Sequence, residues 1–225
     1  MTELNLDTML PSMMGKTITL NGDLSNKRNH LIKQFILDGF DKEGASCVIT
    51  LTISASELIE ELSSFTPESG LIVNDAILNE RLQIIDMYSF RGIQQDEAIP
   101  GTYIMPSADD LTLLSIKLNE VSTNHSKCRI VIWPYSLLSI YTRHRDLLHF
   151  SQTLAARVNA RNQVCLFVYD RGVVAQEEQG ALESIVDGVI ETRKEEREGK
   201  IEEFIRIKFY RGSEDLSYEV WSPLK

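Results

Sequence analysis

The sequence lacks long hydrophobic runs and a signal-like start. No apolar stretch approaches the ~20 residues that a membrane-spanning helix needs. The first residues, MTELNLDTMLPSMM, do not show the basic-then-apolar order of a signal peptide. We therefore expect a cytoplasmic protein without a membrane span.

Cysteine is scarce, and what there is does not suggest a cross-linked or metal-bound protein. Cys47, Cys128 and Cys165 are odd in number, and each falls in or beside an apolar segment. This favours reduced core thiols over disulfides. The four histidines show no zinc-ligand spacing with the cysteines, and no G-x-S-x-G motif suggests a hydrolase triad. We expect no metal site.

Positive charge is also in deficit. The chain has 33 Asp and Glu against 23 Lys and Arg, a net charge of −10, which argues against a dedicated nucleic-acid binder. Basic residues do gather in two places: Lys27, Arg28, His30 and Lys33, and then Arg143, His144 and Arg145. Solvated helix faces are the favoured interpretation of both clusters, and nucleic-acid contact is the alternative.

What is present is an alternation of β-rich apolar segments with amphipathic ones. The expected core strands are Thr17–Leu20, Cys47–Thr52, Leu82–Met87, Arg129–Trp133 and Val164–Tyr169. The expected strands of the tail are Gly188–Glu191, Glu203–Phe209 and Ser217–Trp221, with the charged tract Arg193–Lys200 as an exposed turn. This order predicts one three-layer α/β domain over residues 16–225, after a lead-in of residues 1–15. Its sheet should be mostly parallel and flanked by helices, with a C-terminal antiparallel β-hairpin extension.

Helix starts and loops are indicated by local residues. The expected caps are Ser25 or Asn26, Ser54 or Ser56, and Ser107 with Asp110 three residues on. Residues 89–106 have glycines, prolines and little periodicity, so we expect a long loop and the most mobile part of the chain.

The stretch TITLNGDLSNKRNHLIKQFILDGF, residues 17–40, has the order strand, turn, helix. The turn is expected at Asn21–Asp23. This is the geometry of a phosphate-binding loop, because the first N–H groups of the helix point back at the loop. The glycines and the Lys-Ser/Thr pair that define such a loop are mostly absent.

Four segments together resemble the KaiC-like members of the RecA-type ATPases, over nearly the whole chain. They are NGDLSNKRNHLIKQFI, PSADDLTLLSIKLNEV, RIVIWPYSLLSIY, and DGVIETR followed by FYRGSEDLSYEV. The resemblance implies a RecA-like fold and, in intact members, Mg²⁺-dependent ATP chemistry.

Against the family's phosphate loop (Walker A), Gly22 matches the first glycine. Ser25 and Lys27 replace the next two glycines. Arg28 replaces the lysine, and Asn29 replaces the Mg²⁺-holding Ser/Thr. Side chains at the glycine positions keep the backbone from wrapping a phosphate closely, and a planar guanidinium does not substitute for an ammonium.

The other catalytic positions of the family also differ. Ile53 and Ser54 stand where the family has paired glutamates, and Trp133 stands where Walker B has its Asp. Arg211 matches a hairpin arginine that the resemblance associates with an interface or a trans-acting role, whereas Phe209 replaces the lysine before it. The resemblance therefore implies no catalytic residues and no metal.

The hypothesis that follows is a pseudo-ATPase without cofactor, acting as a regulatory or assembly subunit through contacts with itself or other proteins. One alternative is nucleotide or anion binding without hydrolysis, at an exposed helix start flanked by Lys27 and Arg28. Another is a recombinase-like accessory factor that binds nucleic acid. Asp86 and Asp170 end two strands, where they serve either a ligand site or the next turn.

Overall fold

A nine-stranded sheet forms the centre of the chain, in a computed structural model that describes residues 6–10, 12–40, 44–91, 99–197, 199–212 and 220–224. Its strand order is β4-β3-β2-β5-β6-β1-β7-β8-β9. The strands are β1 Lys16–Gly22, β2 Ala45–Thr50, β3 Leu82–Asp86, β4 Thr102–Ile104, β5 Cys128–Trp133, β6 Val164–Asp170, β7 Gly188–Arg197, β8 Lys200–Tyr210 and β9 Ser222–Pro223. Every pairing from β4 to β7 is parallel, and β8 and β9 are antiparallel. The predicted mostly parallel sheet with an antiparallel extension is confirmed.

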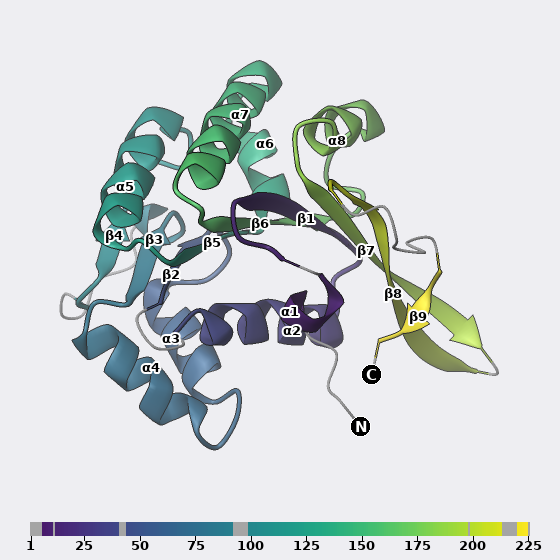
Figure 1. Cartoon of the computed structure of the whole chain (residues 1–225), viewed down its shortest axis with the longest axis horizontal. Helices are drawn as coiled ribbons and strands as arrows, with labels where there is room; N and C mark the ends of the chain where they lie inside the picture. Colours follow the sequence, from purple (N-terminus) through teal and green to yellow (C-terminus); the bar gives the residue numbers. More distant parts are fainter. Residues whose placement is uncertain are drawn as a thin grey trace.

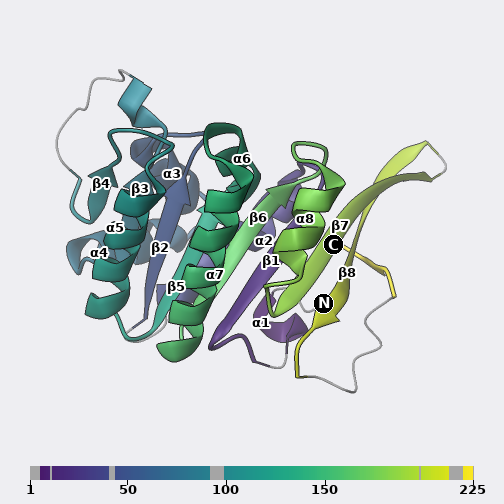
Figure 2. The same ribbon diagram turned by 90° about the horizontal axis from the view of Figure 1, so that it is seen from above.

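Helices cover both faces of the sheet, with α1 to α4 on one side and α5 to α8 on the other (Figures 1 and 2). The helices are α1 Leu6–Met9, α2 Asn26–Leu37, η1 Asp38–Phe40, α3 Ala55–Ser63, α4 Ser69–Leu78, η2 Ser89–Arg91, α5 Leu111–Asn124, η3 Tyr135–Leu137, α6 Leu138–Tyr141, α7 His144–Ala160 and α8 Gln176–Glu183. Two apolar clusters, one under each helical layer, hold the layers together. None of the helices in the described part of the chain is long and apolar enough to cross a membrane.

Strand β1 is longer than its apolar residues predicted. Asn21 and Gly22 were expected in a turn, but they continue the strand and pair with Tyr169 and Asp170 of β6. The partner strand therefore overrides the turn preference of Asn-Gly. Because β1, β6, β5 and β2 are parallel neighbours, their carboxyl ends meet at one edge of the sheet, where ligand sites of such folds form.

The helix caps follow the sequence with one correction. The hydroxyl of Ser25 accepts a hydrogen bond from the Arg28 amide and caps α2. Helix α5, however, is capped by Asp110, whose carboxylate accepts from the Leu113 amide at 2.8 Å, and not by Ser107. Asp110 directly precedes Leu111, the first residue of α5, and therefore occupies the N-cap position, whereas Ser107 lies three residues before it.

Two expected loops contain more regular structure than predicted. Strand β4 and η2 fall within residues 89–106, the segment expected to be the most mobile, and its residues 92–98 lie outside the described residues. In the tail, β7 continues to Arg197 and β8 begins at Lys200, so the charged tract is mostly strand and not turn. Opposite charges across the hairpin, such as Glu191 and Arg206, allow polar residues to form strands here. The expected strand Ser217–Trp221 lies partly outside the described residues, and β9 starts one residue after it.

The three cysteines are free and buried on neighbouring strands, in agreement with the sequence. Burial raises the pKa of the Cys128 thiol to about 12, and it holds the pKa of Cys47 and of Cys165 well above the usual value. Since the thiolate is the reactive form, we expect no reaction of the native protein with Ellman's reagent at about pH 8. All three thiols should react after unfolding in guanidinium. Rapid labelling of one thiol before unfolding would contradict this burial.

Candidate functional site

Only Asp23, Leu24 and Ser25 connect β1 to α2, at the carboxyl edge of the sheet. Ser25 has extended backbone, with φ −155°, and the helix begins directly after it. The expected order of strand, short loop and helix is therefore present. We call the end of β1, this loop and the start of α2 the corner, and the side chains that surround it decide what it can bind.

Arg28, aligned with the lysine of a phosphate loop, is fully buried at 0% exposure. Its Nη1 donates to the carbonyl oxygen of Gly22 at 2.7 Å and to that of Tyr169 at 3.5 Å. Its Nη2 forms an ion pair with Asp170 at the end of β6. The expectation of an exposed cation flanking the helix start is wrong for Arg28, because strand-end carbonyls and a carboxylate lie within reach of its guanidinium.

Gly22 has a packing role that the sequence did not reveal. A Cβ atom at this position would lie 1.9 Å from Oγ1 of Thr192 and 2.8 Å from its backbone oxygen. The φ of Gly22 is outside the left-handed region, so conformational freedom is not the reason for glycine here. Close approach of β1 to β7 is sufficient to explain this residue.

The β7–β8 hairpin covers the start of α2. The Ser25 hydroxyl donates to Oε2 of Glu203 at 2.6 Å, and Nζ of Lys194 donates to the loop carbonyl of residue 24 at 2.6 Å. Lys27 donates from Nζ to the carbonyl of Leu224, also at 2.6 Å. A carboxylate near a helix N-terminus is stabilised by the helix dipole, and it repels a second anion at the same place.

Asn29, aligned with the Mg²⁺-holding hydroxyl, is half-buried. Its backbone N–H donates to the backbone carbonyl of Ser25 at 3.0 Å. Within the described part of the chain its Oδ1 has no hydrogen-bond partner. Among the described residues around this loop, Oδ1 of Asn29, Oδ1 of Asn21 and Nε of Arg28 are the buried side-chain atoms without a hydrogen-bond partner.

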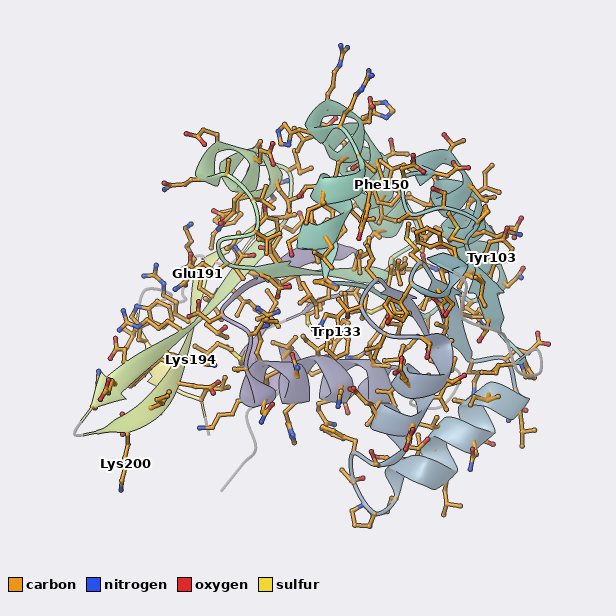
Figure 3. All side chains as sticks on the ribbon, turned by 180° about the vertical axis from the view of Figure 1, so that it is seen from behind. Tyr103, Trp133, Phe150, Glu191, Lys194 and Lys200 are labelled. Atoms are coloured by element: carbon orange, nitrogen blue, oxygen red, sulfur yellow. The ribbon has the colours of Figure 1, made fainter. Side chains whose placement is uncertain are left out.

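Trp133, Ile53 and Ser54 follow β5 and β2 at the same edge, and each has a structural role. Trp133 and Ile53 are partly buried and pack against the apolar cluster beneath α2 to α4. Trp133 is labelled in Figure 3. Ser54 caps α3 in a reciprocal capping box with Glu57, and its hydrogen bonds hold the pKa of the Glu57 carboxyl below its usual value.

Arg211 is half-exposed and lies away from this corner. Its amide donates to the carbonyl of Asp187 at 2.7 Å, and its Nη1 is 3.6 Å from the Asp187 carboxylate. Asp187 directly precedes β7, whose first residue is paired with Ile18 near the start of β1. Arg211 is therefore near the end of β1 opposite Gly22, and the structure does not bring it together with the other candidates.

Two residues that the sequence did not connect with this site complete the corner. Asp170 was expected to serve either a ligand site or the next turn, and Glu203 gave no signal because it begins an expected strand far along the chain. Asp86 instead accepts from the amides of Ala55 and Ser89, at 2.9 and 2.8 Å. The turn-capping interpretation is therefore confirmed for Asp86.

The two basic clusters do not form one cationic surface. In the first, Arg28 is buried, Lys33 pairs with Glu61 at 2.8 Å, and His30 lies against the Phe65 ring. In the second, the charges sit on the exposed start of α7, and His144 is 3.7 Å from a carboxylate of Glu178. A solvated helix face accounts for the second cluster, whereas the first is divided between buried Arg28 and side chains with partners of their own. A surface groove of about 770 Å³ lies elsewhere, between α5 and α7.

Comparison with known proteins gives one family and several structural relatives. The model of the KaiC ATPase family matches residues 6–220. A KaiC-like protein from Pyrococcus horikoshii is 17% identical, with a TM-score of 0.67 over 93% of this chain and 85% of that one. An uncharacterised protein of the same organism, solved with an unknown peptide, is 15% identical, with a TM-score of 0.69 over 88% and 85%. The flagellar accessory protein FlaH from Methanocaldococcus jannaschii is 12% identical, with a TM-score of 0.65 over 88% and 80%. No curated protein matches the chain.

Proposed function

The chain belongs to the KaiC ATPase family, and from this premise we propose that it is a non-catalytic member that acts as a regulatory or assembly subunit through protein contacts. The observation that carries the proposal is the buried ion pair of Arg28 with Asp170. The residue aligned with the phosphate-holding lysine is committed to a carboxylate of the same chain.

A nucleotide would have to displace these internal contacts. Arg28 has no exposed surface, and its guanidinium already holds the carboxylate of Asp170 and the carbonyl of Gly22. Releasing it would leave a buried carboxylate without its counter-charge, which is strongly unfavourable. Glu203, bound through Ser25 at the helix start, adds repulsion toward a triphosphate.

The residues present also suit Mg²⁺ poorly. The orphaned amide oxygen of Asn29 is a weak ligand by itself, and Trp133 supplies no carboxylate at the strand end. Ile53 and Ser54 provide no carboxylate to orient an attacking water. Phosphoryl transfer depends on positioning and charge stabilisation, and we infer that this corner provides neither.

The exposed apolar residues at this edge support protein contact. Leu24 is 67% exposed, Val173 38% and Ile140 61%, and they follow the neighbouring strands β1, β6 and β5. Apolar side chains gathered at one edge suit a protein partner or a second copy of the chain.

Titration with Mg-ATP tests the proposal. We expect no rise in thermal stability and no hydrolysis above background, because the phosphate-holding groups are already bonded within the chain. For comparison, a ligand at 100 times its Kd adds about 2.7 kcal/mol of stability. Stabilisation or turnover that requires Mg²⁺, and that is lost in Lys27→Ala, would contradict the proposal. Lys27 is chosen because it is an exposed residue in the same helical turn as Arg28, and its Nζ is bonded only to a backbone carbonyl among the contacts described above.

A further inference from the structure

The segment Trp221–Leu224, which we call the strap, is added as a short strand to the outer edge of β8. Ser222 pairs with Ile205 and Pro223 with Phe204, in antiparallel register. The Leu224 amide extends the pairing by donating to the carbonyl of Glu203 at 2.7 Å. The strap is therefore held largely through its backbone, as a strand-forming peptide ligand would be.

Two side chains anchor the strap on opposite faces of the hairpin. The Trp221 ring lies under two guanidinium groups, with the Arg193 carbon 4.0 Å and the Arg206 carbon 4.6 Å from the ring centroid. Leu224 is only 2% exposed and belongs to the apolar cluster that contains Ile205. Strand alternation explains the two faces, because the anchors are three residues apart.

A third contact fixes the direction of the strap. Lys27, from the first turn of α2, donates to the carbonyl of Leu224 at 2.6 Å. Between the anchors, Ser222 and Pro223 are exposed, and Val220 before them is 67% exposed. The edge of β8 thus offers main-chain pairing, an aromatic site between cations, an apolar pocket and a lysine for a backbone carbonyl.

We propose that this edge of β8 is a peptide-binding groove, and that the strap occupies it in competition with a partner protein. The partner is an extended peptide with an aromatic residue followed three positions later by leucine. This proposal rests on the proposed function, action through protein contacts, and it names the surface and the class of partner for those contacts. Peptide domains that add a strand obtain affinity from main-chain bonds and specificity from side-chain sites. Here the main-chain pairing runs from Ser222 to Leu224, and the side-chain sites hold Trp221 and Leu224 on opposite faces of the hairpin.

The tether makes the strap an autoinhibitor. Because the strap belongs to the same chain as the edge that it occupies, its effective concentration there is roughly millimolar. With an intrinsic Kd of the strap for this edge of about 10–100 µM, a competing peptide binds the wild type about 10–100-fold more weakly than it binds a chain whose strap is disabled.

Fluorescence anisotropy with a labelled EVWSPLK peptide, the sequence of residues 219–225, tests the groove. The double variant Trp221→Ala/Leu224→Ser is expected to bind the peptide saturably, and the wild type about 10–100-fold more weakly. A peptide with alanine in place of tryptophan should not bind. Arg193→Ala/Arg206→Ala, added to the strap variant, should abolish binding, whereas Lys200→Ala at the far tip of the hairpin should not (Figure 3).

A folded strap variant that does not bind the peptide overturns the proposal, with folding checked by circular dichroism. If that variant does not fold, the wild type decides the question at millimolar peptide: saturable, tryptophan-dependent binding supports the groove, and none overturns it. Nucleotide binding is a separate result. Mg-ATP turnover would overturn the proposed function without affecting the proposed peptide-binding groove. Absence of peptide binding would overturn the groove without affecting the proposed function.

Discussion

Replacing Arg28 by alanine is expected to lower the free energy of unfolding by about 3–5 kcal/mol, the usual cost of breaking a buried ion pair from one side. Asp170, only 8% exposed, would remain as a buried carboxylate without its partner. The carbonyl of Gly22 would lose the guanidinium donor at 2.7 Å and keep the Arg171 amide at 2.9 Å. Urea denaturation followed by circular dichroism measures the change.

Matched variants separate this ion pair from ordinary surface charge. Lys33→Ala removes an ion pair on the same helix whose Glu61 partner is 44% exposed, and about 0–1 kcal/mol is expected. The double variant Arg28→Met/Asp170→Leu should recover part of the loss, because neither charge is then left alone. A loss below about 1 kcal/mol in Arg28→Ala would show that Arg28 does not hold this corner closed.

The central sheet was predictable because its strands carry a strong local signal. Buried parallel strands are continuous β-rich runs, and Cys47–Thr52 and Val164–Tyr169 both have this character. Alternation with helical segments then leaves few topologies. The ends of the strands were harder to predict from the sequence. Asn21 and Gly22 prefer turns, and they belong to a strand only because they pair with β6.

The contents of the site depended on contacts between distant parts of the chain. Arg28 and Asp170 are 142 positions apart, and Ser25 and Glu203 are 178 apart. The sequence identified which residues replace the family's catalytic groups. It contained no sign that Arg28 turns inward, because that direction depends on the carboxylate at the end of another strand.

The length of the strands in the β7–β8 hairpin was underestimated for a related reason. Charged residues have low strand propensity, so Arg193–Lys200 suggested a turn. In the fold, cross-strand pairs such as Glu191 with Arg206 compensate, and the strands extend well beyond the body of the molecule (Figure 1). Lys194 and Glu203 on this hairpin then reach the start of α2. The expected turn at Arg193–Lys200 thus concealed Lys194, one of the groups that close the site.

Gly22→Ala is expected to lower the free energy of unfolding by about 1–3 kcal/mol, and by more if the strands cannot separate. The added methyl would lie 1.9 Å from Oγ1 of Thr192 and 2.8 Å from its backbone oxygen, so β1 and β7 would have to move apart. Adding Thr192→Ala to Gly22→Ala removes the contact with Oγ1 but not the contact with the backbone oxygen. The double variant should therefore recover part of the lost stability. Thermal and urea unfolding measure both variants.

The opposite behaviour is expected for Gly180→Ala in α8, where no described atom lies within 4 Å of the added carbon. That variant should be more stable by roughly 0.5–1 kcal/mol, since alanine is the better helix former. The pair distinguishes two explanations of Gly22. If this glycine served phosphate binding alone, Gly22→Ala would leave stability unchanged and alter only nucleotide affinity. If it serves the approach of β1 to β7, stability falls whether or not a nucleotide is present.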